Sequence, residues 1–388
     1  MLQVICAHTF KMRKRGEKPL EKQLIIRGAA PQEQPLWALP CFLAQVDCER
    51  EFTTIAFLKK PYGLPMEELA DRGYIARLNQ EHRQMIKPQP IQGILPIAHT
   101  PFTADDQIDY PSLQRQIDWA YSVGANGFAT GMVSEILRLT ADERLKLTDK
   151  LVQFSRGRGA VIMSVGAESK AQAIVYARRA ETAGCDGVMA IVPISTALPS
   201  EQVLSYYRAI ADAIAIPVVV QDASSYVGKA ISLEVYVQLL NQYGPEKILF
   251  KPEAAPIGPN LSALRDASGG KARVLEGSGG ILLVDSYRRG IVGTMPGMEF
   301  LEGIVALWHA LARGDEEAIY RLYFPICALV ALQLQAGLDG FLSIEKYILH
   351  KKGLFTTDRR REPHSWSMDE ETRLEVYRLL VKLEEAIA

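Results

Sequence analysis

The sequence predicts a (β/α)₈ TIM barrel with a C-terminal helical extension and a poorly ordered N-terminal extension. Eight short apolar runs rich in β-branched residues begin near residue 91, and amphipathic helical stretches separate them. This alternation indicates βα units around a parallel sheet, and eight strands close a barrel. The strand signals lie at 93–100, 127–130, 160–165, 187–192, 217–222, 248–251, 272–277 and 291–295.

The helical stretches support the same architecture. They lie at 110–124, 141–154, 170–184, 200–214 and 233–244, and three of them end in glycine, the usual helix stop. An open doubly wound sheet is the alternative, but it predicts a Gly-rich phosphate turn after the first strand, where this sequence has HTPFTADD.

Further helical stretches follow the eighth strand signal, at 300–313, 315–336, 341–351 and 369–387. They exceed what one barrel needs, so we expect them to pack on the flank of the barrel. We therefore divide the chain into an N-terminal extension (1–90), a barrel (91–300) and a C-terminal helical extension (301–388).

Residues 1–90 differ from the rest, with a basic cluster from Lys11 to Lys22 and little sustained periodicity. We interpret the cluster as a solvated tail. Low order is predicted for 1–60 and a helix near 66–85. Met66 and Met85 are alternative starting residues.

The bulk composition excludes several classes of protein. The net charge is −1, from 44 basic and 45 acidic residues, which predicts neither a nucleic-acid nor a membrane partner. The five cysteines include no CxxC pair, so a disulfide framework or zinc knuckle is not indicated, and reduced thiols suit a cytoplasmic protein. No apolar run approaches the roughly 18–20 residues of a membrane-spanning helix.

One lysine stands out among the residues at the C-terminal ends of the predicted strands, where barrel enzymes carry their chemistry. Lys251 directly follows the apolar run Ile-Leu-Phe and would point into the barrel mouth. Desolvation there favours the uncharged amine, the form that attacks a carbonyl. The alternative is a solvated lysine at a strand end, which is common.

Carboxylates at neighbouring strand ends raise a second possibility. Asp222, Glu253 and Glu276, with His99, could bind a divalent cation. No spacing singles out a ligand set, so we favour ordinary hydrogen-bonded carboxylates and predict no metal and no cofactor. Glu135 is expected to bond the backbone of neighbouring loops.

Five segments, in order, resemble the dihydrodipicolinate synthase / N-acetylneuraminate lyase family. They are GILPIAHTPF, GMVSEILRLTADER, AETAGCDGVMAIVP, IPVVVQDASSYVG and ILFKPEAA. The resemblance implies a lyase that acts on a 2-oxo acid such as pyruvate and assembles as a homotetramer, a dimer of dimers. It places Lys251 on the lysine that forms the Schiff base.

The departures from the family pattern concern the proton relay. The family's paired threonines fall on Met132 and Val133, its fifth-strand tyrosine on Gln221, and the tyrosine after the fourth strand on Ser195. The arginine that holds the second substrate's carboxylate in the synthases falls near Tyr226. The chain therefore resembles the sugar-acid members, such as 2-keto-3-deoxy-arabonate dehydratases and related aldolases, more than the lysine-pathway synthases.

These considerations give the predicted site. Lys251 and Gln221 are the catalytic candidates, and the substrate-binding candidates are Val133, Ser134, Ser195 and Val292. Gln221, Ser195, Tyr226 and Asp222 are candidates for the acid or base that replaces the tyrosine.

The predicted function is a Schiff-base lyase of a 2-keto-3-deoxy sugar acid, a dehydratase or an aldolase. We favour dehydration because the retro-aldol members use the missing tyrosine. A metal-dependent lyase in the same barrel and a non-catalytic ligand-binding barrel are the alternatives.

Overall fold

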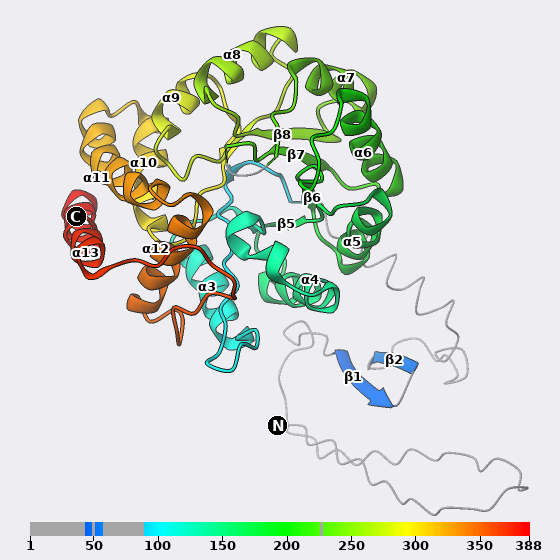
Figure 1. Ribbon diagram of the computed structural model, residues 1–388, viewed down its shortest axis with the longest axis horizontal. Coiled ribbons are helices and arrows are strands. Elements are labelled where there is room, and N and C mark those ends of the chain that lie inside the picture. Colours follow the sequence, from blue (N-terminus) through cyan, green and yellow to red (C-terminus); the bar gives the residue numbers. More distant parts are fainter. Residues whose placement is uncertain (1–42, 49–50, 57–88, 226–227) are drawn as a thin grey trace, which may run out of the picture. The chain divides into compact units, whose positions relative to one another are not determined.

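A computed structural model describes residues 43–48, 51–56, 89–225 and 228–388 (Figure 1). Contacts divide the chain into two compact units, Met1–Asn79 and Gln80–Ala388. In the first unit, β1 (Leu43–Cys48) and β2 (Glu51–Ala56) pair antiparallel, with Cys48 opposite Glu51. The sequence analysis did not predict this pair. The helix predicted at 66–85 lies outside the described residues.

The second unit contains the predicted eight-stranded parallel barrel. β4 to β8 form one sheet, and β3, β10 and β9 form another. Parallel bridges between Ile97 and Ala129 and between Phe250 and Val274 join the two sheets and close the barrel. The strands are β3 (Gly93–Ile94), β4 (Gly127–Ala129), β5 (Ala160–Ser164), β6 (Gly187–Ala190), β7 (Val218–Asp222), β8 (Ile248–Pro252), β9 (Leu275–Glu276) and β10 (Gly293–Thr294).

Helices surround this barrel, as Figure 1 shows. The five predicted helices are present: α3 (Tyr110–Ser122), α4 (Ala141–Ser155), α5 (Lys170–Ala183), α6 (Ser200–Ala213) and α7 (Leu233–Tyr243). α8 (Ile257–Ala267) and α9 (Leu283–Arg288) were not predicted. α8 begins with Ile-Gly-Pro-Asn, a composition typical of turns, and α9 has only six residues.

Alternation along the strands decides which side chains face the barrel interior. Leu249 belongs to the apolar cluster inside the barrel, whereas its neighbours Ile248 and Phe250 pack in the larger cluster that includes the surrounding helices. Because side chains alternate along a strand, Lys251 follows Leu249 into the interior. By the same reasoning Gln221 follows Val219 on β7.

The C-terminal helices are α10 (Leu301–Arg313), α11 (Glu316–Leu334), α12 (Gly337–Lys351) and α13 (Glu370–Ile387). α12 begins four residues before its predicted start and contacts the 3₁₀ turn η1 (Met132–Ser134) that follows β4. The extension therefore reaches the mouth of the barrel.

α11 is long and apolar enough to cross a membrane, by length and composition alone. In the second unit it packs against α10, α12 and α13, and 39% of its apolar window is buried.

Candidate active site

Lys251 lies at the end of β8, in register with Gln221 on β7. Its side chain is buried, and Nζ lies 3.2 Å from Oε1 of Glu253. Because Pro252 separates the two residues, both side chains turn toward the same side of the strand end. The candidate nucleophile thus has a carboxylate within reach.

Glu253 is also buried and has a second partner. Nε2 of Gln221 donates a hydrogen bond to Oε2 of Glu253 at 2.8 Å. Burial raises the pKa of Glu253 above its usual value, and the charge of Lys251 and the Gln221 hydrogen bond oppose that rise. A carboxylate with a raised pKa beside an amine is suited to move protons near neutral pH.

A glycine leaves room for this arrangement. A Cβ added at Gly277 would lie 2.3 Å from Cε of Lys251 and 2.6 Å from Oε1 of Glu253. The GSGG segment after β9 therefore allows close packing against the lysine. This is a steric role, distinct from the phosphate site that such a segment can form.

A cavity of about 460 Å³, counted with its open mouth, contains these groups. Strand ends, the loops after them and α12 contribute its walls: Ile97, Met132, Val133, Gln221, Lys251, Glu253, Gly277, Gly279, Met295, Gly297, Leu338, Phe341 and Glu345.

The structure places the four predicted substrate-binding residues differently from one another. Val133 lines the cavity. Ser134 is buried, and its hydroxyl donates to the carbonyl of Ala98. Ser195 is exposed and its hydroxyl hydrogen-bonds to Glu168.

Val292 precedes β10 and packs against the apolar cluster inside the barrel, and it is not among the residues that line the cavity. Tyr226 lies outside the described residues. The substrate-binding roles of all four residues stay predictions.

The other strand-end carboxylates, Asp222 and Glu276, accept hydrogen bonds from neighbouring residues. Asp222 accepts hydrogen bonds from the backbone N–H groups of Ser224 at 3.0 Å and Ile231 at 2.8 Å. Glu276 accepts one from the hydroxyl of Thr294 at 2.8 Å. These contacts fit the interpretation of Asp222 and Glu276 as ordinary hydrogen-bonded carboxylates.

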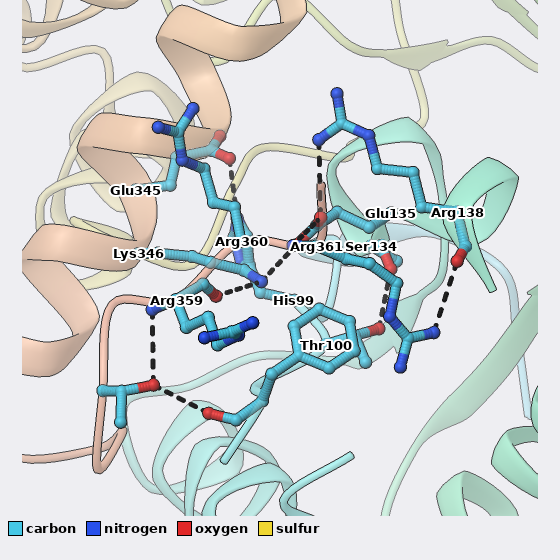
Figure 2. Close-up of polar contacts among 12 residues, drawn as sticks. His99, Thr100, Ser134, Glu135, Arg138, Glu345, Lys346, Arg359, Arg360 and Arg361 are labelled. Atoms are coloured by element: carbon cyan, nitrogen blue, oxygen red, sulfur yellow. Dashed lines mark hydrogen bonds and ion pairs between the residues drawn. The ribbon is translucent and has the colours of Figure 1, made fainter. Parts of the chain in front are cut away.

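A buried polar cluster at the cavity wall was missed by the sequence analysis. Nε2 of His99 lies 2.8 Å from Oε2 of Glu345, and Glu299 accepts a hydrogen bond from Gln333 at 2.7 Å (Figure 2 shows the His99–Glu345 pair). Burial raises the pKa of Glu345 to about 8 and of Glu299 to about 7, and lowers that of His99 to about 4. Because 246 positions separate His99 from Glu345, no local motif reveals their contact.

The same three residues are the described group best arranged to hold a metal ion. Their ligand atoms lie within 4.8 Å of one another. The metal-binding set considered from the sequence was His99 with Asp222, Glu253 and Glu276, so the two sets share only His99.

A second buried pair ties the extension to the barrel. Nζ of Lys346 donates to Oε1 of Glu135 and to the carbonyl of Arg359 at 3.0 Å (Figure 2). Glu135 also accepts from the backbone N–H of Arg361 at 2.9 Å. Glu135 thus bonds backbone of another segment, as predicted.

Comparisons with known proteins agree with this architecture. Residues 90–253 match the Dihydrodipicolinate synthetase family. The chain carries a domain of the dihydrodipicolinate synthetase family. Relatives that the chain matches are named as a dehydratase and as synthases.

The chain is similar to family members with different named activities. It is 27% identical over 298 residues to the L-2-keto-3-deoxyarabonate dehydratase of Azospirillum brasilense, covering 76% of this chain and 94% of that protein. It is 29% identical to the 4-hydroxy-tetrahydrodipicolinate synthase of Methanosarcina mazei, covering 62% and 81%. The structure of dihydrodipicolinate synthase from Rhodopseudomonas palustris matches with a TM-score of 0.67 and 29% identity, covering 75% of this chain and 97% of that one.

Proposed function

We propose that this chain dehydrates a 2-keto-3-deoxy sugar acid through a Schiff base on Lys251. One observation carries the proposal: the buried Lys251 shares a cavity with the carboxylate of Glu253, 3.2 Å from its amine. Similarity to an L-2-keto-3-deoxyarabonate dehydratase supports the sugar-acid substrate.

The first step joins enzyme and substrate. The neutral amine of Lys251 attacks the C2 carbonyl, and the carbonyl oxygen leaves as water to give a protonated imine. Glu253, the carboxylate nearest to Nζ among the described residues, accepts the proton that the attacking amine loses and returns it to the carbinolamine oxygen. That oxygen takes a second proton from solvent and leaves as water, so Glu253 is again ionised. Gln221 holds that carboxylate in place from β7.

The second step uses the same carboxylate. The protonated imine withdraws electrons, so the C3–H bond becomes acidic, and Glu253 removes the proton to leave an enamine on Lys251. When the C4–O bond breaks, the enamine electrons form a C3=C4 double bond and the imine is restored. Loss of a C5 proton, protonation at C3 and ketonisation of the resulting C4=C5 enol convert the C5 hydroxymethyl group to an aldehyde. Hydrolysis of the imine then releases a 2-oxo acid semialdehyde and free Lys251.

Replacement of the family's tyrosine supports dehydration over aldol cleavage. Cleavage of C3–C4 needs a base at the C4 hydroxyl, and the amide of Gln221 cannot act as one. The cavity has carboxyl groups instead, one directly after β8 and one on α12. A carboxylic acid can protonate a leaving hydroxyl group.

Product analysis tests the reaction. The purified protein is incubated with a 2-keto-3-deoxy pentonate, and the products are separated and identified by mass. A 2-oxo acid semialdehyde with the mass of the substrate minus water is expected. Pyruvate with a two-carbon aldehyde would instead establish aldol cleavage.

The family resemblance also leads us to propose a homotetramer. Light scattering should give a mass near four times the chain mass of 43.0 kDa. A monomeric mass would contradict this assembly.

A further inference from the structure

We propose that Glu345, a residue of the C-terminal helical extension, donates the proton with which the substrate's hydroxyl group leaves as water. The proposal rests on the proposed function and names a second catalytic residue for it. It assigns chemistry to α12, which lies outside the barrel proper.

The position of Glu345 is the first argument. Its side chain is buried and lines the cavity that contains Lys251 and Glu253. Leu338 and Phe341, from the same helix, line that cavity as well. α12 therefore forms one wall of the site, and Glu345 contributes the carboxyl group of that wall.

The surroundings of Glu345 fix its orientation. His99 contacts Oε2 at 2.8 Å. His99 is itself held by Gln116, whose Oε1 accepts from the His99 backbone N–H at 2.9 Å and whose Nε2 donates to the His99 carbonyl at 2.9 Å. One oxygen of Glu345 is thus anchored to the barrel and the other is left for the cavity.

Gly297 shows where that second oxygen lies. A Cβ added there would be 2.8 Å from Oε1 of Glu345 and 2.1 Å from Oε2 of Glu299. Gly297 also lines the cavity, so Oε1 of Glu345 lies at the cavity wall. Oε2 of Glu299 has no hydrogen-bond partner among the described residues.

Charge explains why this carboxyl group holds a proton. Glu299 after β10 and Glu135 after β4 are the other carboxyl groups whose charges act on the cluster, and Lys346 is the nearby cation. Lys251 and Glu253 line the same cavity as Glu345. Lys346, next along α12, binds Glu135 instead. The buried carboxyl group of Glu345 contacts His99, and no lysine or arginine among the described residues forms an ion pair with it. A buried carboxylate without a paired cation is strongly disfavoured, which favours the protonated form of Glu345.

The tautomer of His99 follows from the same contacts. With its proton on Nε2, His99 donates to Oε2 of Glu345, and Glu345 carries its own proton on Oε1, toward the cavity. This leaves Nδ1 of His99 as an acceptor, the ring atom that has no partner among the described residues.

The elimination then balances. Glu253 takes the C3 proton, the electron pair of that bond forms the enamine, and the C4–O pair departs on oxygen. Oε1–H of Glu345 gives its proton to that oxygen, which leaves as water. His99 stabilises the resulting carboxylate through Nε2–H, and a proton passed back from Glu253 through water restores both groups.

Glu345→Gln tests the proposal, because glutamine keeps the shape and the hydrogen bond but has no acidic proton. Glu384→Gln, at an exposed position on α13, is the matched control. Borohydride trapping of the imine should match wild type in both variants. For Glu345→Gln, kcat on a 2-keto-3-deoxy pentonate should fall by roughly 10²–10⁴-fold.

A change of leaving group distinguishes proton donation by Glu345 from a merely structural role, which would affect both leaving groups equally. Fluoride leaves with much less help from an acid than hydroxide does. A substrate with fluorine in place of the C4 hydroxyl should therefore be turned over by Glu345→Gln at close to the wild-type rate. Glu345→Asp, which keeps an acidic proton, should recover part of the lost activity on the hydroxyl substrate.

The outcomes separate this proposal from the one on which it rests. No imine in the wild type would overturn the proposed function. Normal imine trapping with undiminished turnover in Glu345→Gln would overturn the role of Glu345 alone. Equal losses on the fluorinated and hydroxyl substrates would also overturn it, as would a bound divalent cation that Glu345→Gln removes.

Discussion

The side-chain amide of Gln221 donates to Glu253 at 2.8 Å across the β7–β8 pair. Gln221 occupies the fifth-strand position that carries a tyrosine in the dihydrodipicolinate synthase / N-acetylneuraminate lyase family, which the sequence resembles. An amide cannot relay a proton, but it can orient a group that does. We therefore propose that Glu253, which also contacts Lys251, handles the proton in place of the tyrosine.

Loss of this hydrogen bond should change the pH dependence of turnover. The bond lowers the pKa of Glu253, so Gln221→Leu should raise it. Because Glu253 acts as a base in its ionised form, the acidic limb of the pH–rate profile should move to higher pH. The exposed Gln202→Leu is the control, and an unmoved limb in Gln221→Leu would contradict the role of Gln221.

Glu253→Gln separates bond formation from proton abstraction. It retains an uncharged, similarly shaped side chain but loses the base, so kcat should fall by roughly 10²–10⁴-fold. Exchange of the C3 proton of pyruvate with deuterium from solvent, followed by NMR, should slow in parallel. Undiminished exchange would assign the base to another residue.

Synthase activity should be absent. Condensation of pyruvate with aspartate semialdehyde relies on the tyrosine relay that Gln221 replaces. A coupled assay should detect no turnover at the rates of typical enzymes, which have kcat values of roughly 1–10³ s⁻¹. Turnover in that range would refute the inference drawn from the missing tyrosine.

Stability should fall as the pH rises from about 6.5 to 8. Folding raises the pKa of Glu299 to about 7 and of Glu345 to about 8, so the folded state binds more protons than the unfolded state in this window. His99, whose pKa is lowered to about 4, remains neutral there. Denaturant unfolding should show that the free energy of unfolding depends less on pH for Glu299→Gln than for wild type. An unchanged pH dependence would contradict the raised pKa of Glu299 in the folded state.

The pair of Lys346 and Glu135 should contribute strongly to stability. Lys346→Met leaves the buried Glu135 carboxylate with only Arg138, at 3.5 Å, as a cationic partner. Removal of one partner from a buried pair costs about 3–5 kcal/mol, which sets the upper end of the expected loss. Lys352→Met, on the more exposed pair with Glu302, should cost about 0–1 kcal/mol. Denaturant unfolding measures the free energy of unfolding of both variants. Similar losses in the two would show that the buried pair contributes no more to stability than the exposed pair.

The sequence predicted the barrel because its eight strand signals are short, apolar and regularly separated by helices. The positions of Lys251 and Gln221 followed from alternation and from family motifs. α8 was missed because its Gly-Pro-Asn start has the composition of a turn. The pair β1–β2 was missed because the sequence analysis found little sustained periodicity in residues 1–90 and predicted low order for 1–60.

The site was predicted less completely than the fold. Glu253 was noted at a strand end, but as one of several carboxylates, since only the structure distinguishes it from Asp222 and Glu276 by its contact with Lys251. Glu345 could not be found, because its approach to His99 depends on how α12 packs against the barrel.

Borohydride trapping tests the central claim most directly. The protein is incubated with pyruvate or a 2-keto-3-deoxy sugar acid, reduced with borohydride, and analysed by intact mass and by peptide mapping. The expected result is one stable adduct per chain on the peptide that contains Lys251, absent from Lys251→Ala. An adduct that persists in Lys251→Ala, or none with any 2-oxo acid, would contradict the Schiff-base mechanism.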